Sequence, residues 1–129
     1  MDHLIDTCAL IFFLEDSPQL SETAARAIED PVSRSFVSLA SLWEISLKHA
    51  IGKLNVSYAD APDLPELLKS QGFELLPMDW EAIRLSAKLP FHHRDPFDRL
   101  LISEAQRKNL PIISSDQVFD RYEVRRIWK

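Results

Sequence analysis

The chain has 129 residues, of which 15 are basic and 20 are acidic, and 46% of its residues are hydrophobic. This length predicts a single domain over residues 1–129 that can fold without covalent staples. The single Cys8 excludes an internal disulfide framework and fits a reducing, cytoplasmic compartment. No secretory signal and no apolar run near the roughly 20 residues of a membrane span is evident, so we expect no membrane association.

Hydrophobic pattern and turn residues predict short strands that alternate with helices. In chain order we expect a strand over 3–6, helices over 7–15 and 22–29, a strand over 35–38, a helix over 39–51, a helix after 63 that ends at 72, a strand over 73–76, a helix from 80 to about 88, a helix over 96–108, a strand over 111–114 and a fifth candidate strand over 124–128. The predicted N-cap residues are Ser21, Ser38, Asp63, Asp79 and Asp95. This alternation predicts an α/β fold, a three-layer α/β/α domain around a mostly parallel sheet.

Charge is distributed unevenly along the chain. Residues 1–83 hold 5 basic and 14 acidic side chains, whereas residues 84–129 hold 10 basic and 6 acidic ones. The overall charge of −5 argues against a surface that binds phosphate everywhere. A basic C-terminal third leaves room for a local anionic partner, although charge alone favours an uneven surface without one.

Two acids are expected at the carboxyl edge of the sheet, where ligands of such folds bind. Asp6 ends the first predicted strand, and Asp116 follows the fourth. Each has a structural alternative. Asp6 could cap the helix that starts at 7, and Asp116 could cap a turn or short helix toward Tyr122.

Two further acids lie on helices that border the same edge. Glu44 sits at the border of the apolar face of its helix, where it is partly desolvated; a salt bridge or an exposed rim position is the alternative. Asp98 shares a helix face with Leu101, Ile102 and Ala105, and so points inward. The positive end of the helix dipole tolerates a carboxylate there but does not explain its inward direction.

Together, the four acids can surround one crevice. Two like charges repel by about 4 kcal/mol at about 4 Å when the effective dielectric constant is near 20. A cation must therefore neutralise the cluster, or some carboxylates take up protons. With oxygen ligands and no Cys or His at metal spacing among them, the expected ion is Mg²⁺ or Mn²⁺, which suits phosphoryl chemistry.

The spaced motifs resemble those of PIN domains, most closely the bacterial VapC-type toxins. They are Leu4-Ile5-Asp6-Thr7, Glu44 within a helix, the run from Asp98 to Ala105, and Ile112-Ile113-Ser114-Ser115-Asp116. The resemblance implies a ribonuclease that uses Mg²⁺ or Mn²⁺, with Asp6, Glu44, Asp98 and Asp116 as its catalytic, metal-binding quartet. It also implies flanking hydroxyls at Thr7 and Ser114, which we expect to contact substrate, a small antitoxin partner and a homodimer.

The chain departs from this pattern at two positions. Asp95 offers a second acid three residues before Asp98; as the predicted N-cap it points away from the core face, but a shared metal site stays open. Asp116 stands where many relatives have Asn, which keeps the site acidic.

Several other residues were weighed for roles in binding. Arg94 and Arg99 flank the acids and are predicted phosphate ligands, with ion pairs to Asp95 or Asp98 as the alternative. His92 and His93 could contact substrate or assist proton transfer, but a surface position is favoured for both. Trp43 is expected in the core or an interface. The apolar residues 11–14 are expected to be buried or to contact a second subunit or the antitoxin, and the basic tail (Arg121, Arg125, Arg126 and Lys129) to be solvated.

The leading hypothesis is a metal-dependent endoribonuclease of a toxin–antitoxin pair. A phospho-acceptor signalling domain has a similar layout, but the chain lacks the lysine that such a domain needs after the strand at 112–114. A catalytically inactive PIN-like binding module is the third alternative, and the intact set of acids argues against it.

Overall fold

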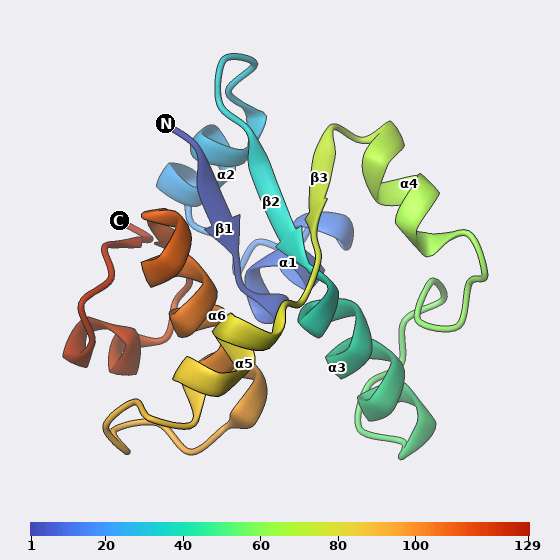
Figure 1. Ribbon diagram of the computed structural model, residues 1–129. Coiled ribbons are helices and arrows are strands. Elements are labelled where there is room, and N and C mark those ends of the chain that lie inside the picture. Colours follow the sequence, from blue (N-terminus) through green and yellow to red (C-terminus); the bar gives the residue numbers. More distant parts are fainter.

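A computed structural model describes residues 1–129 as five strands, six α-helices and one 3₁₀ helix (Figure 1). In chain order they are β1 (His3–Ile5), α1 (Thr7–Leu14), α2 (Glu22–Glu29), β2 (Ser35–Ser38), α3 (Leu39–Ala50), α4 (Leu64–Ser70), β3 (Phe73–Leu76), α5 (Trp80–Ser86), α6 (Pro96–Lys108), β4 (Ile112–Ile113), η1 (Gln117–Arg121) and β5 (Arg126–Ile127).

The five strands form one sheet in the order β3-β2-β1-β4-β5, and every neighbouring pair is parallel. Successive residues of a strand face opposite sides of the sheet. Ile5 and Ile113 belong to the core cluster that also holds residues of α1, α2 and α4, whereas Leu4 and Ile112 pack with α6 and η1. The predicted three-layer α/β/α fold is thus confirmed, with both faces of the sheet covered.

Most helix starts follow the predicted N-cap chemistry. The side chains of Ser21, Ser38, Asp79 and Asp95 each accept a hydrogen bond from a backbone N–H of the first turn that follows. Asp63 occupies the N-cap position of α4, but its side chain accepts no such hydrogen bond, and this helix has a proline in its first turn. The predicted fifth strand is confirmed as the short β5 at the sheet edge.

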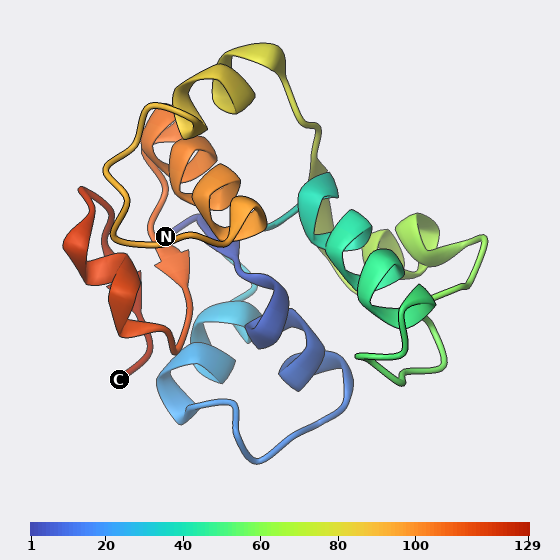
Figure 2. The ribbon, with the colours of Figure 1, turned by 90° about the horizontal axis from the view of Figure 1, so that it is seen from below.

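Because all strands run in one direction, their carboxyl ends meet at one edge of the sheet. Helices α1, α3 and α5 follow β1, β2 and β3 from this edge, and α6 begins beside it. Figure 2 looks onto this edge and shows the first turns of α1, α3 and α6 grouped around its centre. No helix of the chain has the length and apolar character required to cross a bilayer.

Candidate active site

Asp6 connects β1 to α1 and is almost fully buried. Its Oδ1 accepts a hydrogen bond from the backbone N–H of Ala9 at 2.8 Å, so the capping role considered from the sequence is present. The pKa of Asp6 is raised to about 6, chiefly by burial and also by the charges of Glu44 and Asp116, although the nearby Ser114 hydroxyl and the Ala9 N–H oppose the shift. The cap therefore offsets only part of the cost of burying this charge.

Glu44 lies in the second turn of α3, with 3% of its surface exposed. Its Oε2 is paired with Lys48 one turn later, and this hydrogen bond is the main reason that the pKa of Lys48 is raised. Its other oxygen, Oε1, is buried and has no hydrogen-bond partner. A buried carboxylate oxygen without a donor is unfavourable, and a bound cation would satisfy it.

Asp98 lies in the first turn of α6, and its side chain is 20% exposed. Its pKa is raised to about 8, chiefly by burial and then by the charges of Asp95, Asp6, Glu44 and Asp116. Asp95 supplies the N-cap of the same helix, where its Oδ1 accepts from the N–H groups of Phe97 and Asp98 at 2.8 and 3.2 Å. The charge of Asp95 thus adds to the cluster, but one of its oxygens is already committed to the helix.

Asp116 follows β4 and caps η1, with Oδ1 accepting from the N–H of Val118 at 2.9 Å. Its Oδ2 lies 3.0 Å from Nε2 of His93, and the same nitrogen lies 2.9 Å from Oδ2 of Asp98. One ligand atom from each of these three residues falls within 4.8 Å of the others. Asp6 and Glu44 lie outside this tight group, and their charges act on it from farther away.

The expectation that His93 is a surface residue, and that no histidine lies among the acids, is therefore wrong. Its side chain is only 16% exposed, because the loop before α6 folds back across the acidic edge. His92, its neighbour, is exposed as expected and contacts the ring of Tyr122. The periodicity of a helix says nothing about a residue that precedes the helix, so no sequence signal distinguished the two histidines.

The donor set fits a hard divalent cation. Carboxylates from four separate segments supply oxygen atoms, the Oε1 of Glu44 lacks a partner, and no hydrogen bond reaches Oδ1 of Asp98. Mg²⁺ and Mn²⁺ prefer such oxygens, and a cation would offset the mutual repulsion that contributes to the raised pKa of Asp98.

Comparison with known proteins decides the family. The sequence model described as "PIN domain" matches residues 3–124 of this chain. The chain belongs to the PIN domain family. No curated protein sequence matches it.

Solved structures with the same fold come from bacterial toxin–antitoxin complexes. VapBC2 of Rickettsia felis, bound to a DNA fragment from its promoter, is 14% identical with a TM-score of 0.71, over 98% of this chain and 99% of that one. VapBC-1 of nontypeable Haemophilus influenzae is 19% identical with a TM-score of 0.69, over 98% and 96%. VapBC-5 of Mycobacterium tuberculosis is 20% identical with a TM-score of 0.61, over 99% and 98%. At these identities the likeness establishes the fold.

In this PIN domain, Arg99 cannot serve as the predicted phosphate ligand. It is 5% exposed, and its two terminal nitrogens donate to the carbonyl oxygens of Ser86, Leu89, Pro90 and His93 at 2.8–3.0 Å. The alternative ion pair with Asp95 or Asp98 is absent as well. Arg99 instead fixes the loop between α5 and α6. Arg94 is exposed and has no partner within the chain, so it stays a candidate for binding phosphate.

Thr7 and Ser114 are also placed differently from the prediction of substrate contact. Thr7 is 5% exposed and donates to the Ser41 hydroxyl at 2.9 Å, which ties α1 to α3. Ser114 is fully buried and accepts from the N–H of Asp116 at 2.9 Å. Both side chains are buried, and both hydroxyls hold the backbone that carries an acid.

Two apolar predictions have mixed outcomes in the PIN domain. Ile11, Phe13 and Leu14 pack partly against the core, in agreement with burial of the first helix. Trp43 is 56% exposed and contacts Phe97 edge-on with ring centres 5.0 Å apart, so it does not belong to the core. Its role in an interface stays a prediction.

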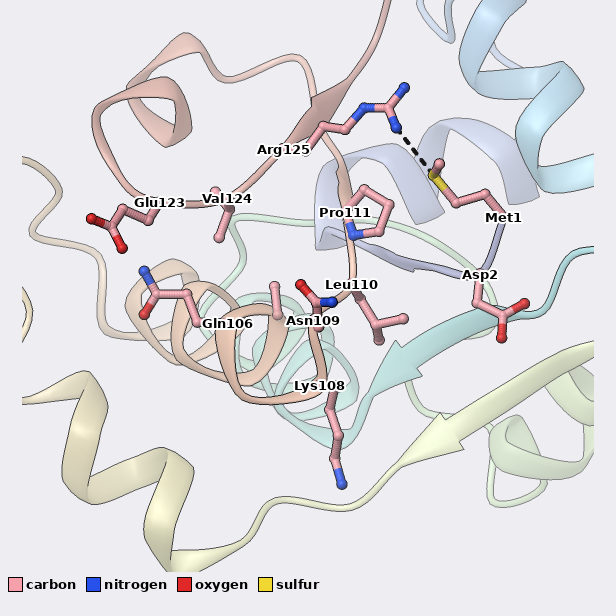
Figure 3. A pocket seen from close by; sticks show the side chains of 11 residues that line it. Met1, Asp2, Gln106, Lys108, Asn109, Leu110, Pro111, Glu123, Val124 and Arg125 are labelled. Carbon is pink, nitrogen blue, oxygen red and sulfur yellow. Dashed lines mark hydrogen bonds between the residues drawn. The ribbon is translucent and has the colours of Figure 1, made fainter.

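The largest hollow of this PIN domain, about 710 Å³, lies at the opposite, amino end of the strands. Figure 3 shows that the charged groups of Asp2, Lys108 and Glu123 point in different directions, while Arg125 turns to the sulfur of Met1. None of the four predicted acids lines this hollow. It lacks the convergent polar groups that mark a ligand site, and the acidic edge is the better candidate.

Proposed function

We propose that this PIN domain is a divalent-metal-dependent endoribonuclease, the toxin of a VapC-type toxin–antitoxin pair. PIN domains are generally nucleases, and the solved structures with this fold are of toxin–antitoxin complexes. The observation that carries the proposal is the carboxylate of Asp98, whose pKa burial and four neighbouring acids raise to about 8. A cluster this costly to ionise is explained best by a cation that it holds.

In the proposed reaction, the quartet of Asp6, Glu44, Asp98 and Asp116 holds Mg²⁺ or Mn²⁺. When bound, such an ion lowers the pKa of water and stabilises negative charge on a phosphodiester. The protein's own groups keep the carboxylates in place. The Ala9 N–H orients Asp6, Lys48 orients Glu44, and His93 contacts both Asp98 and Asp116.

RNA is the proposed substrate, and Arg94 the proposed contact to its phosphate backbone. Arg94 is exposed, unpaired and four residues from Asp98, which suits a guanidinium that binds a phosphate beside the reacting one. We further propose that a small antitoxin blocks the site and that the protein forms a homodimer in the cytoplasm. Residues 1–129 form one domain in this proposal.

The test compares two aspartate-to-asparagine variants. Asp98→Asn removes a proposed ligand, whereas Asp60→Asn changes an exposed aspartate far along the chain from the four acids. We expect Asp98→Asn to lower Mg²⁺-dependent cleavage of single-stranded RNA by about 100-fold or more, and Asp60→Asn to leave it unchanged. Undiminished cleavage by Asp98→Asn would refute the assignment. Absence of cleavage and of Mg²⁺ binding in the unmodified protein would favour an inactive binding module.

A further inference from the structure

His93 is held at more points than any other residue of the loop before α6. Its backbone N–H donates to the Tyr122 hydroxyl at 2.8 Å, and that hydroxyl donates to the Pro90 carbonyl at 2.6 Å. Its own carbonyl accepts from Arg99 at 3.0 Å. Its ring lies beside the fully buried ring of Phe119, with centres 5.8 Å apart. The imidazole is therefore fixed in position before any ligand arrives.

The surroundings of the ring decide which nitrogen carries the proton. Nδ1 lies 3.3 Å from the backbone nitrogen of Asp95, and that N–H can only donate. Nδ1 must therefore present its lone pair, and the ring proton resides on Nε2. The N–H of Nε2 donates to Oδ2 of Asp116 at 3.0 Å, and Oδ2 of Asp98 lies 2.9 Å from the same nitrogen.

This arrangement is the reverse of a metal-bound histidine. A ligating histidine gives the lone pair of one nitrogen to the metal and donates the N–H of the other to a carbonyl or carboxylate. Here the nitrogen that faces the acids is the one that carries hydrogen, and the opposite nitrogen faces a donor. Close approach to two carboxylates alone would suggest a nitrogen ligand and a preference for zinc or a similar metal.

We propose that His93 is a positioning residue that holds Asp116 beside Asp98 as a hydrogen-bond donor and does not bind the metal. It donates to one oxygen of Asp116, contacts one oxygen of Asp98 and leaves Oδ1 of Asp98 free for a hard cation. The inference rests on the proposed metal site and adds to it the residue that fixes two of its acids next to each other. It also explains why the site keeps an oxygen-only ligand set although a histidine lies within reach.

The first experiment examines the unmodified protein by long-range ¹H–¹⁵N correlation NMR, without metal and with Mg²⁺. We expect His93 to carry hydrogen on Nε2 in both conditions. A proton on Nδ1, or an Nε2 that loses its hydrogen when Mg²⁺ binds, would overturn the proposal. Because this measurement needs neither a variant nor RNA, its outcome is independent of whether the protein cleaves RNA.

The second experiment compares three variants by calorimetric titration with Mn²⁺. The amide nitrogen of Gln reaches the position of Nε2, whereas that of Asn reaches only the position of Nδ1. We expect His93→Ala and His93→Asn to weaken Mn²⁺ binding by about tenfold, and His93→Gln to stay within about threefold of the unmodified protein. Thermal unfolding of each variant establishes that it is folded.

The variants also separate this proposal from the competing role of a nitrogen ligand. Gln binds metals poorly, so a ligating histidine predicts equal losses in His93→Gln and His93→Ala, and equal losses would overturn our proposal. Unchanged Mn²⁺ binding in His93→Ala would overturn it as well. If the unmodified protein did not cleave RNA while the three variants behaved as expected, the proposed ribonuclease activity would fail and the positioning role of His93 would stand.

Discussion

Two glutamates of this PIN domain are equally buried, yet only one of them belongs to the candidate site. Glu44 on α3 and Glu104 on α6 are each 3% exposed, and each has a buried oxygen without a hydrogen-bond partner. The charge of Glu44 contributes to the raised pKa values of Asp6 and Asp98. Glu104 contributes to neither, and it lines a hollow of about 10 Å³ between α5 and α6.

The difference lies in what surrounds each carboxylate. Burial raises the pKa of Glu104 to about 7; Ser38 lies near enough to lower it somewhat, although neither oxygen has a hydrogen bond of good geometry. An isolated acid of this kind can take up one proton and become neutral. In the cluster around Asp98, several acids share one space, and protonating one leaves the others charged. A buried unpaired carboxylate thus indicates a site only where other charges converge on it.

The largest expected effect separates the two glutamates by function. Glu44→Gln removes a proposed metal ligand, and we expect it to lower RNA cleavage by about 100-fold. Glu104→Gln is the matched control, with the same chemical change at the same burial, and we expect cleavage within about twofold of the unmodified protein. Steady-state cleavage of a fluorogenic RNA at saturating Mg²⁺ measures both. Equal losses in the two variants would mean that burial, rather than the cluster, governs activity.

A similar contrast holds between two arginines, because Arg99 is buried and Arg94 is exposed to solvent. Arg99→Ala leaves four carbonyl oxygens of the loop between α5 and α6 without their donor, and we expect it to lower the free energy of unfolding by about 3 kcal/mol. Arg94→Ala is expected to change stability by no more than about 0.5 kcal/mol and to raise KM for RNA instead. Urea unfolding and steady-state kinetics separate these outcomes. A stable Arg99→Ala variant with impaired RNA binding would restore Arg99 as a phosphate ligand.

The raised pKa values of Asp6 and Asp98 decide how the stability of the protein and its affinity for Mg²⁺ change with pH. Asp6 and Asp98 bind protons more tightly when folded than when unfolded, so the metal-free protein loses stability as pH rises from about 4 through about 6 and then about 8. Mg²⁺ competes with those protons and binds best at high pH. At a free concentration of about 100 times its Kd, Mg²⁺ raises the free energy of unfolding by about 2.7 kcal/mol.

Thermal unfolding with and without Mg²⁺, at about pH 5 and about pH 8, measures this effect. We expect the Mg²⁺-induced increase in Tm to be large at the higher pH and nearly absent at the lower one. Glu104→Gln should show the same dependence, because Glu104 lies outside the cluster. An Mg²⁺ effect that is the same at both pH values would contradict a site made of these acids.

Sequence alone predicted the strands and the places of the four acids well, because both follow from local rules. A residue that follows a parallel strand lies at the carboxyl edge, and Asp6 and Asp116 follow β1 and β4 in this way. Asp98 lies in the first turn of α6, and Glu44 lies one turn further into α3. The path of the loop between α5 and α6 depends on Arg99, whose hydrogen bonds reach back up to 13 residues. Neither propensity nor periodicity encodes such contacts, and so the roles of His93 and Arg99 were missed.

The smallest expected effect concerns Glu104 by itself. Its pKa is raised from 4.5 to about 7, so the protonated form stabilises the fold fully below about pH 4.5, and this contribution is lost as pH rises through about 7. Glu104→Gln keeps the shape and removes the charge. We expect it to match the unmodified protein near pH 5 and to be more stable by about 1 kcal/mol near pH 8. Urea unfolding at the two pH values measures this difference. A loss of stability at the higher pH would mean that the ionised Glu104 is paired after all, and the distinction between a lone buried acid and a cluster would then have to rest on Glu44 alone.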